Sequence, residues 1–144
     1  MSPQKKFISK VKERGVVTVE FAILLPLIML ILVGLMEGGH LWHLQHTITN
    51  ASREGARAAI VYKENYSQTE VETRAKEAVR IYLEKFLPKD PPVWETTVVA
   101  PATYASGSDV TVRVITNEGM LLLDTIIPAF QGISVQAETT MKLE

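Results

Sequence analysis

The sequence predicts an α+β protein with a long N-terminal helix that crosses a membrane, a second helix, and a small antiparallel sheet of about three strands. Three observations lead to this prediction. Residues 16–36 are almost continuously apolar, residues 67–87 repeat apolar side chains at helical spacing, and residues 94–143 contain runs of alternating apolar and polar side chains. With 144 residues, the chain has room for one small domain beside the membrane segment.

The first 15 residues form a basic leader. They hold five of the fifteen basic residues of the chain and a single acid, Glu13. Because an excess of Lys and Arg beside a membrane helix stays on the cytoplasmic side, we expect residues 1–15 in the cytoplasm and residues 63–144, as a folded head, outside it. The head is acidic, which disfavours nucleic acid as a partner because surfaces that bind nucleic acid are basic. The chain has no cysteine, which excludes disulfides and thiolate metal sites.

Residues 16–36 are long enough to cross a lipid bilayer. As a helix they span roughly 31 Å, close to the thickness of the hydrocarbon core. A cleaved secretory signal has a shorter apolar core of about 7–15 residues and a small-x-small cleavage site, and the sequence after Met36 offers no such site. We therefore expect a single-pass anchor that stays attached to the inner (cytoplasmic) membrane, with Trp42 where membrane proteins carry interfacial aromatic residues.

Glu20 places a charge inside the apolar run, four residues after Val16. An acidic residue near the centre of a membrane helix costs about 2.5–3.5 kcal/mol, and less towards the interface. Two interpretations stay open. Either Glu20 extends its carboxylate to the interface, or it has a cationic partner in an assembled state.

The junction between the leader and the apolar run has a recognisable pattern. Residues 14–21 read RGVVTVEF, so that Gly15 ends the basic leader, Val16 begins the apolar run, and Glu20 stands fifth after Gly15 with the aromatic Phe21 beside it. In this pattern the chain resembles the prepilins.

Three further stretches narrow the resemblance. The sequence reads LLP at residues 24–26, EGG at 37–39 and NASREGAR at 50–57. With these stretches, the chain resembles the TadE-like minor pilins, or pseudopilins, of the tight-adherence (Flp pilus) secretion system. The resemblance covers about residues 14–59.

The resemblance implies a pilin-like fold and a role as a structural or assembly component of a pilus or secretion apparatus. It implies a precursor that a membrane aspartic prepilin peptidase cleaves between Gly15 and Val16, at a processing site formed by Gly15, Val16, Glu20 and Phe21. The new α-ammonium of Val16 would then pair with Glu20. The implied partners are the lipid bilayer, the prepilin peptidase, other pilin or pseudopilin subunits and the pilus assembly platform, with a place at the cell surface after assembly.

Pro26 lies inside the predicted membrane helix. Proline has no N–H and leaves the carbonyl of Ala22 without its helical partner, which predicts a kink. The resemblance implies a flexible point that serves assembly. The alternative is that the membrane helix merely tolerates this proline.

We expect the helix to continue from the membrane segment to residue 62, since no proline follows Pro26 before residue 88. Beyond the membrane, Arg53 and Arg57 are four residues apart on one face, and Glu54 is within reach of Arg57. Together with Gly55, these residues form a candidate face for docking sibling subunits. The alternative is a solvated face with salt bridges.

A second helix is predicted over residues 67–87. Ser67 and Glu70 form a capping box, and Pro88 follows the end. A single apolar stripe is expected from Val71, Ala75, Ala78, Val79, Tyr82 and Phe86.

Three strands are predicted from the alternation of apolar and polar residues, over residues 94–100, 109–116 and 133–143. Between the last two, residues 120–130 are very apolar. We interpret them as a lid over the open end of the core, with an exposed contact patch as the alternative.

The sequence contains few candidate residues for catalysis or metal binding. His40, His43 and His46 follow Glu37 at steps of three, and a His-x-x-His pair is able to bind a metal. Each step turns the stripe by about 60°, so an interfacial polar collar explains these residues better. We find no motif for a nucleophile, a phosphate loop or a metalloprotease and expect no enzyme, metal or cofactor. The alternative to an assembly subunit is an uncleaved, membrane-anchored binding module with an extracytoplasmic head.

Overall fold

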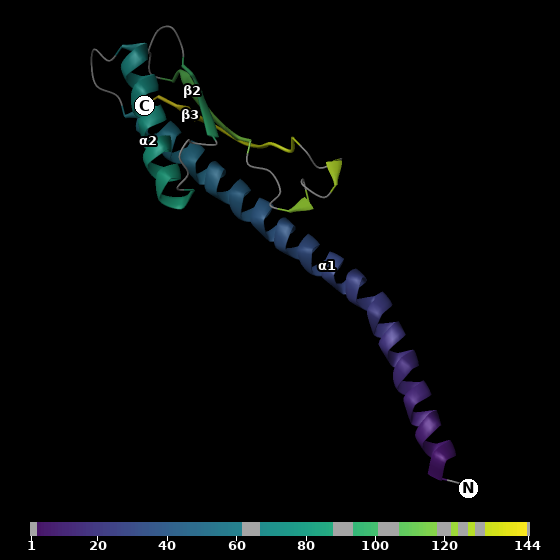
Figure 1. Ribbon diagram of the computed structural model, residues 1–144. Coiled ribbons are helices and arrows are strands. Elements are labelled where there is room, and N and C mark those ends of the chain that lie inside the picture. The colour runs from purple at the N-terminus through teal and green to yellow at the C-terminus, as the bar shows by residue number, and fades with distance from the viewer. Residues whose placement is uncertain are drawn as a thin grey trace. The chain divides into compact units, whose positions relative to one another are not determined.

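The computed structural model describes residues 3–61, 67–87, 94–100, 107–117, 122–123, 127–128 and 132–143, with side chains from residue 16 onward. The elements follow in the order α1 (Pro3–Ile60), α2 (Gln68–Phe86), β1 (Trp94–Val99), β2 (Asp109–Thr116) and β3 (Val135–Lys142) (Figure 1). The chain divides into two compact units, Met1–Gly38 and Gly39–Glu144. These elements confirm the predicted α+β fold, with a long apolar N-terminal helix, a second helix and a three-stranded antiparallel sheet.

Helix α1 is longer at its start than the sequence predicted. It begins at Pro3 and includes most of the basic leader, where a start at residue 16 was expected. Proline is favoured in the first turn of a helix, and the Lys, Glu, Gln and Arg residues that follow are good helix formers. Pro26 lies inside α1, which is helical on both sides of it. The predicted kink at Pro26 remains a prediction.

Helix α2 begins and ends where its caps predicted. The backbone N–H of Ser67 donates to the Glu70 carboxylate at 2.8 Å, and the Ser67 hydroxyl accepts from the Glu70 N–H at 3.3 Å, which is the predicted capping box. At the other end, the N–H of Leu87 donates to the carbonyl of Leu83 at 2.6 Å. These two caps confirm the helix over residues 67–87.

The buried stripe of α2 differs from the prediction at its last position. Val71, Ala75, Val79 and Leu83 are buried, whereas Phe86 is 44% exposed. Steps of four residues keep side chains on nearly one face of a helix, so Leu83 continues the row and Phe86 was wrongly included. Ala78 and Tyr82 are half-buried at its margin.

The sheet is antiparallel in the order β1-β2-β3. In its register Thr97 lies beside Arg113, which lies beside Glu138. On its inner face, Val110, Val112 and Val114 of β2 are buried. The outer face carries mostly polar residues, with the exposed Val99 among them, as expected for an antiparallel sheet with one solvated side.

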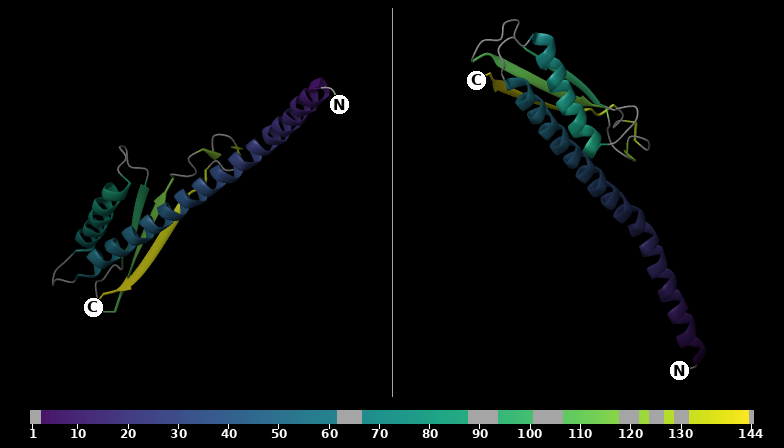
Figure 2. Two further views of the ribbon diagram at one scale, coloured as in Figure 1. Left: turned by 90° about the horizontal axis from the view of Figure 1, so that it is seen from below. Right: turned by 90° about the vertical axis from the view of Figure 1, so that its left-hand side faces the viewer.

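The described residues of the head form a hydrophobic core inside the unit Gly39–Glu144. The C-terminal part of α1 and helix α2 pack on the inner face of the sheet (Figure 2). The residues that α1 contributes to the core are Ile48 and three alanines, Ala51, Ala56 and Ala59. Most of residues 120–130 lie outside the described residues, so neither interpretation of that segment is tested.

Candidate assembly site on helix α1

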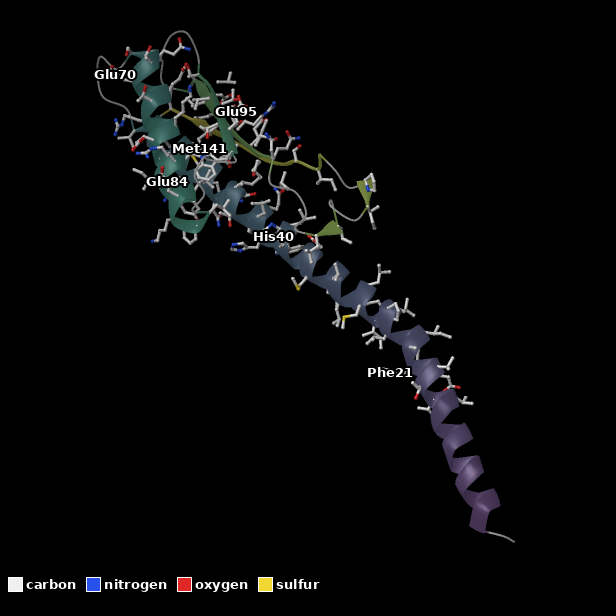
Figure 3. The ribbon with its side chains drawn as sticks, viewed as in Figure 1. Phe21, His40, Glu70, Glu84, Glu95 and Met141 are labelled. Atoms are coloured by element: carbon white, nitrogen blue, oxygen red, sulfur yellow. The ribbon has the colours of Figure 1, made fainter. Side chains whose placement is uncertain are left out.

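The surface of α1 over residues 16–36 is apolar and exposed. The accessible fraction of its large apolar side chains runs from 39% at Leu25 to 70% at Ile23, and Val33 is half-buried. Figure 3 shows the side chain of Phe21 extending from the helix. This helix is long and apolar enough to cross a membrane by length and composition. A contiguous apolar surface of this kind marks contact with a membrane or a partner chain, and α1 is consistent with a single-pass anchor.

The four residues of the predicted processing site form two adjacent pairs within α1, Gly15 with Val16 and Glu20 with Phe21. Val16 is 54% exposed and Phe21 is 59% exposed. Glu20 is exposed and stands one helical turn after Val16, so the two residues share a face. The geometry of α1 therefore allows the carboxylate of Glu20 to reach a positive charge on the backbone nitrogen of Val16.

The charged residues of the predicted docking face lie on the exposed side of α1. Arg53, Glu54 and Arg57 are exposed. The Arg57 Nη1 atom lies 3.9 Å from Glu54 Oε1, and their side chains are 74% and 49% exposed. An ion pair this exposed contributes little to stability, about 0–1 kcal/mol, so these side chains are available to a partner.

Gly55 does not belong to that exposed face, and the prediction was wrong to include it. Gly55 is buried between α2 and β2. A β-carbon at this position would stand 2.5 Å from Val79 Cγ2, 3.1 Å from Val112 Cγ1 and 3.2 Å from the carbonyl oxygen of Ala75. No real β-carbon makes the first of these contacts. Gly55 is therefore a packing residue that lets α1 approach α2 and β2 closely.

Two polar contacts fasten the C-terminal part of α1 to β3. The hydroxyl of Ser52, which is fully buried, lies 2.7 Å from the hydroxyl of Thr139. The Gln45 side-chain amide donates to the carbonyl of Gln136 at 3.2 Å. Sequence reasoning missed both contacts, because the partners are 87 and 91 residues apart and neither pair carries a local pattern.

The histidines do not converge. His43 and His46 are exposed and His40 is half-buried. Within the described part of the chain, no three His, Cys, Asp or Glu residues are placed to hold a metal ion. The ring of His46 instead lies 5.3 Å from that of Trp42, with a tilt of 50° between the ring planes.

The family model of TadE-like proteins matches residues 15–57. This region is TadE-like. The match confirms the predicted resemblance, and it begins at Gly15 and ends at Arg57, so it holds both the processing-site residues and the charged face. Comparison with curated proteins and with solved structures finds no significant match. The TadE-like region ends inside α1, and the rest of the head lies beyond it.

Proposed function

We propose that this TadE-like protein is a minor pilin or pseudopilin, a structural component of a tight-adherence-type pilus or secretion apparatus. One observation carries the proposal. The TadE-like region coincides with a helix whose first part is an exposed apolar surface and whose second part is built into the core of a folded head. A subunit that packs against other subunits through its helix and exposes its head needs one helix with these two parts. The role is structural, and no catalytic residue or cofactor takes part in it.

The proposed precursor is cleaved between Gly15 and Val16 by a prepilin peptidase. Water adds to the carbonyl carbon of Gly15 and the C–N bond to Val16 breaks, which leaves a carboxylate on Gly15 and an ammonium on Val16. Gly15 lies inside α1, so the backbone has to leave the helix before it enters a protease site. Glycine weakens a helix by about 0.8–1 kcal/mol relative to alanine, which makes this the point of the junction where unwinding is easiest.

The new ammonium of Val16 then pairs with the carboxylate of Glu20, in the same chain or in a neighbour. The shared face of the two residues on α1 supports this pairing. In an apolar environment a charge without its partner costs about 3–5 kcal/mol. The pairing therefore makes assembly depend on prior cleavage, since the uncleaved chain has no ammonium at Val16.

The exposed charges of Arg53, Glu54 and Arg57 form the proposed contact with other pilin subunits or with the assembly platform. They lie outside the apolar segment, on the side of α1 that the head core leaves open. With the positive leader in the cytoplasm, this face and the head lie outside the inner membrane.

Cross-linking in cells that carry a complete tight-adherence system tests the proposal. The chain has no cysteine, so a single cysteine at Arg53 can be compared with a single cysteine at Thr97, an exposed residue of β1 on the outer face of the sheet. We expect Arg53→Cys to cross-link to pilin or platform subunits and Thr97→Cys to give much less product. A chain that keeps its leader and cross-links to no subunit from either position contradicts the proposal and favours the uncleaved binding module.

A further inference from the structure

Trp42 is the most exposed large apolar side chain among the described residues, with 71% of its surface accessible. An indole is a large amphipathic group, apolar over most of its surface with one N–H donor. Burying that apolar surface is favourable, so the exposed indole can stabilise contact with an apolar or interfacial environment. The chemistry of that environment follows from the residues around Trp42.

Trp42 stands in a largely polar stretch of α1 that follows the apolar run. Six residues before Trp42 the apolar run ends at Met36, and two residues after it Leu44 is fully buried in the head. His43 and Gln45 are exposed beside it. The ring of His46 lies 5.3 Å from the indole and presents a further polar group one turn along the helix. An indole between apolar and polar neighbours is the composition of a membrane interface.

The spacing along the chain agrees with this environment. Residues 15 and 42 are 27 positions apart, which corresponds to roughly 40 Å of α-helix. A bilayer including both headgroup layers is about 40–45 Å thick. The length of helix between the two positions therefore matches the thickness of a bilayer with both of its headgroup layers.

We propose that Trp42, with His46 against it, is a membrane-interface anchor that inserts its indole among the lipid headgroups on the outer side of the bilayer. The anchor sets the depth of α1 and so holds the Gly15–Val16 bond at the cytoplasmic surface, where a membrane peptidase works. The inference rests on the proposed membrane location of α1, and it adds a lipid contact that a membrane helix does not by itself require.

Fluorescence quenching by brominated lipids measures the depth of an indole directly. The full-length chain is reconstituted into phosphatidylcholine vesicles in which the lipids carry bromine either near the glycerol end or near the methyl end of the acyl chains. The chain has two tryptophans, Trp42 and Trp94. Trp42→Phe leaves only the emission of Trp94, which is half-buried against the head core, and Trp94→Phe leaves only that of Trp42. Quenching in the unsubstituted chain is also compared with quenching in Trp42→Phe. This comparison measures the contribution of Trp42 even if Trp94→Phe disturbs the head.

Because tryptophans of membrane proteins gather at the interface, we expect lipids brominated near the glycerol end to quench the Trp42 emission more than lipids brominated near the methyl end. We expect the Trp94 emission to be unaffected by both. Flotation of the same vesicles shows whether the protein is bound to the membrane, and so distinguishes the membrane helix from the interface anchor. Protein that floats while Trp42 is unquenched, or is quenched more by the deep bromines, overturns the interface anchor and leaves the membrane helix in place. Protein that does not float overturns both.

Discussion

Gly55 of α1 faces Val79 of α2 so closely that a β-carbon on Gly55 would stand 2.5 Å from Val79 Cγ2. Ala56 and Ala59, the small residues that follow, are also buried in the core. A helix lined with such side chains can lie close to its neighbours, and the residues around it are then packed as densely as any protein interior. The TadE-like region ends two residues after this contact, so it includes the point at which the helix joins the head.

Gly55→Ala is expected to destabilise the head. The added methyl group overpacks the contact with Val79 and Val112, at a cost of about 1–3 kcal/mol. The better helix propensity of alanine offsets less than about 1 kcal/mol of this. Thermal unfolding of the detergent-solubilised chain, followed by circular dichroism, should show a lower Tm.

Gly39→Ala is the matched control, because a β-carbon at Gly39 would meet nothing within 4 Å. It should leave the Tm unchanged or raise it. Combining Gly55→Ala with Val79→Ala should recover part of the loss, since the shorter side chain at residue 79 makes room for the new methyl group. If Gly55→Ala is as stable as Gly39→Ala, the close approach of α1 and α2 is wrong.

The capping box of α2 predicts a dependence of stability on pH. The backbone N–H and then the hydroxyl of Ser67 hydrogen-bond to the carboxylate and lower the pKa of Glu70 from 4.5. A carboxyl with a depressed pKa in the folded state adds stability above its unfolded pKa and loses it as the pH falls through the folded value. We expect Glu70→Gln to have a lower Tm than the unsubstituted chain at pH 7, and the difference to close below pH 4.5. Glu95→Gln, at an exposed position of β1 (Figure 3), is the control, and the same closing difference there would remove the capping explanation.

The parts of the fold that were predicted correctly depend on local patterns. Ser67 and Glu70 stand within one turn and fix the start of α2, and the alternation along β3 fixes which of its side chains face the core. Gly55 was wrongly assigned to the exposed docking face because it stands between the charged residues Glu54 and Arg57 in the sequence. Its reason is the distance to Val79, which only the packing of α1 on α2 creates. The Ser52–Thr139 contact was missed for the same cause, since it joins residues 87 positions apart.

Labelling of single cysteines tests the orientation of α1. The positive-inside preference predicts that a cysteine at Thr97 reacts with a membrane-impermeant maleimide in intact spheroplasts, whereas one at Lys10 reacts only after lysis. The cells used lack the prepilin peptidase, so that the leader with Lys10 stays attached. Both substitutions use the natural absence of cysteine in the chain. Labelling of the Lys10 position before lysis, with protection of the Thr97 position, would show the reverse orientation.

Glu20→Ala distinguishes a charge that serves assembly from one that the membrane merely tolerates. Removing the carboxylate should spare insertion, because a charge inside the apolar run is costly, and should spare cleavage after Gly15. Assembly should fall, since the Val16 ammonium then lacks its partner at a cost of about 3–5 kcal/mol. Glu20→Gln should fail almost as badly, because the amide keeps the shape and loses the charge.

Co-purification of the processed variant with the pilus or its platform is the measurement for Glu20. Glu13→Ala is the matched control, because Glu13 leaves with the leader and its loss should not affect assembly. Processed Glu20→Ala that assembles at the level of the unsubstituted chain would falsify the charge pairing and leave Glu20 as a residue that reaches the interface.

The N-terminal residue of the protein extracted from membranes tests the central claim most directly. Intact mass spectrometry, in cells that contain a prepilin peptidase, should find a chain that begins at Val16, and Gly15→Leu should restore the mass of the complete leader. Val16 at the N-terminus, lost in the Gly15→Leu variant, is the result that a processed pilin subunit predicts. A chain that still begins at Met1 or Ser2 in the presence of the peptidase contradicts it.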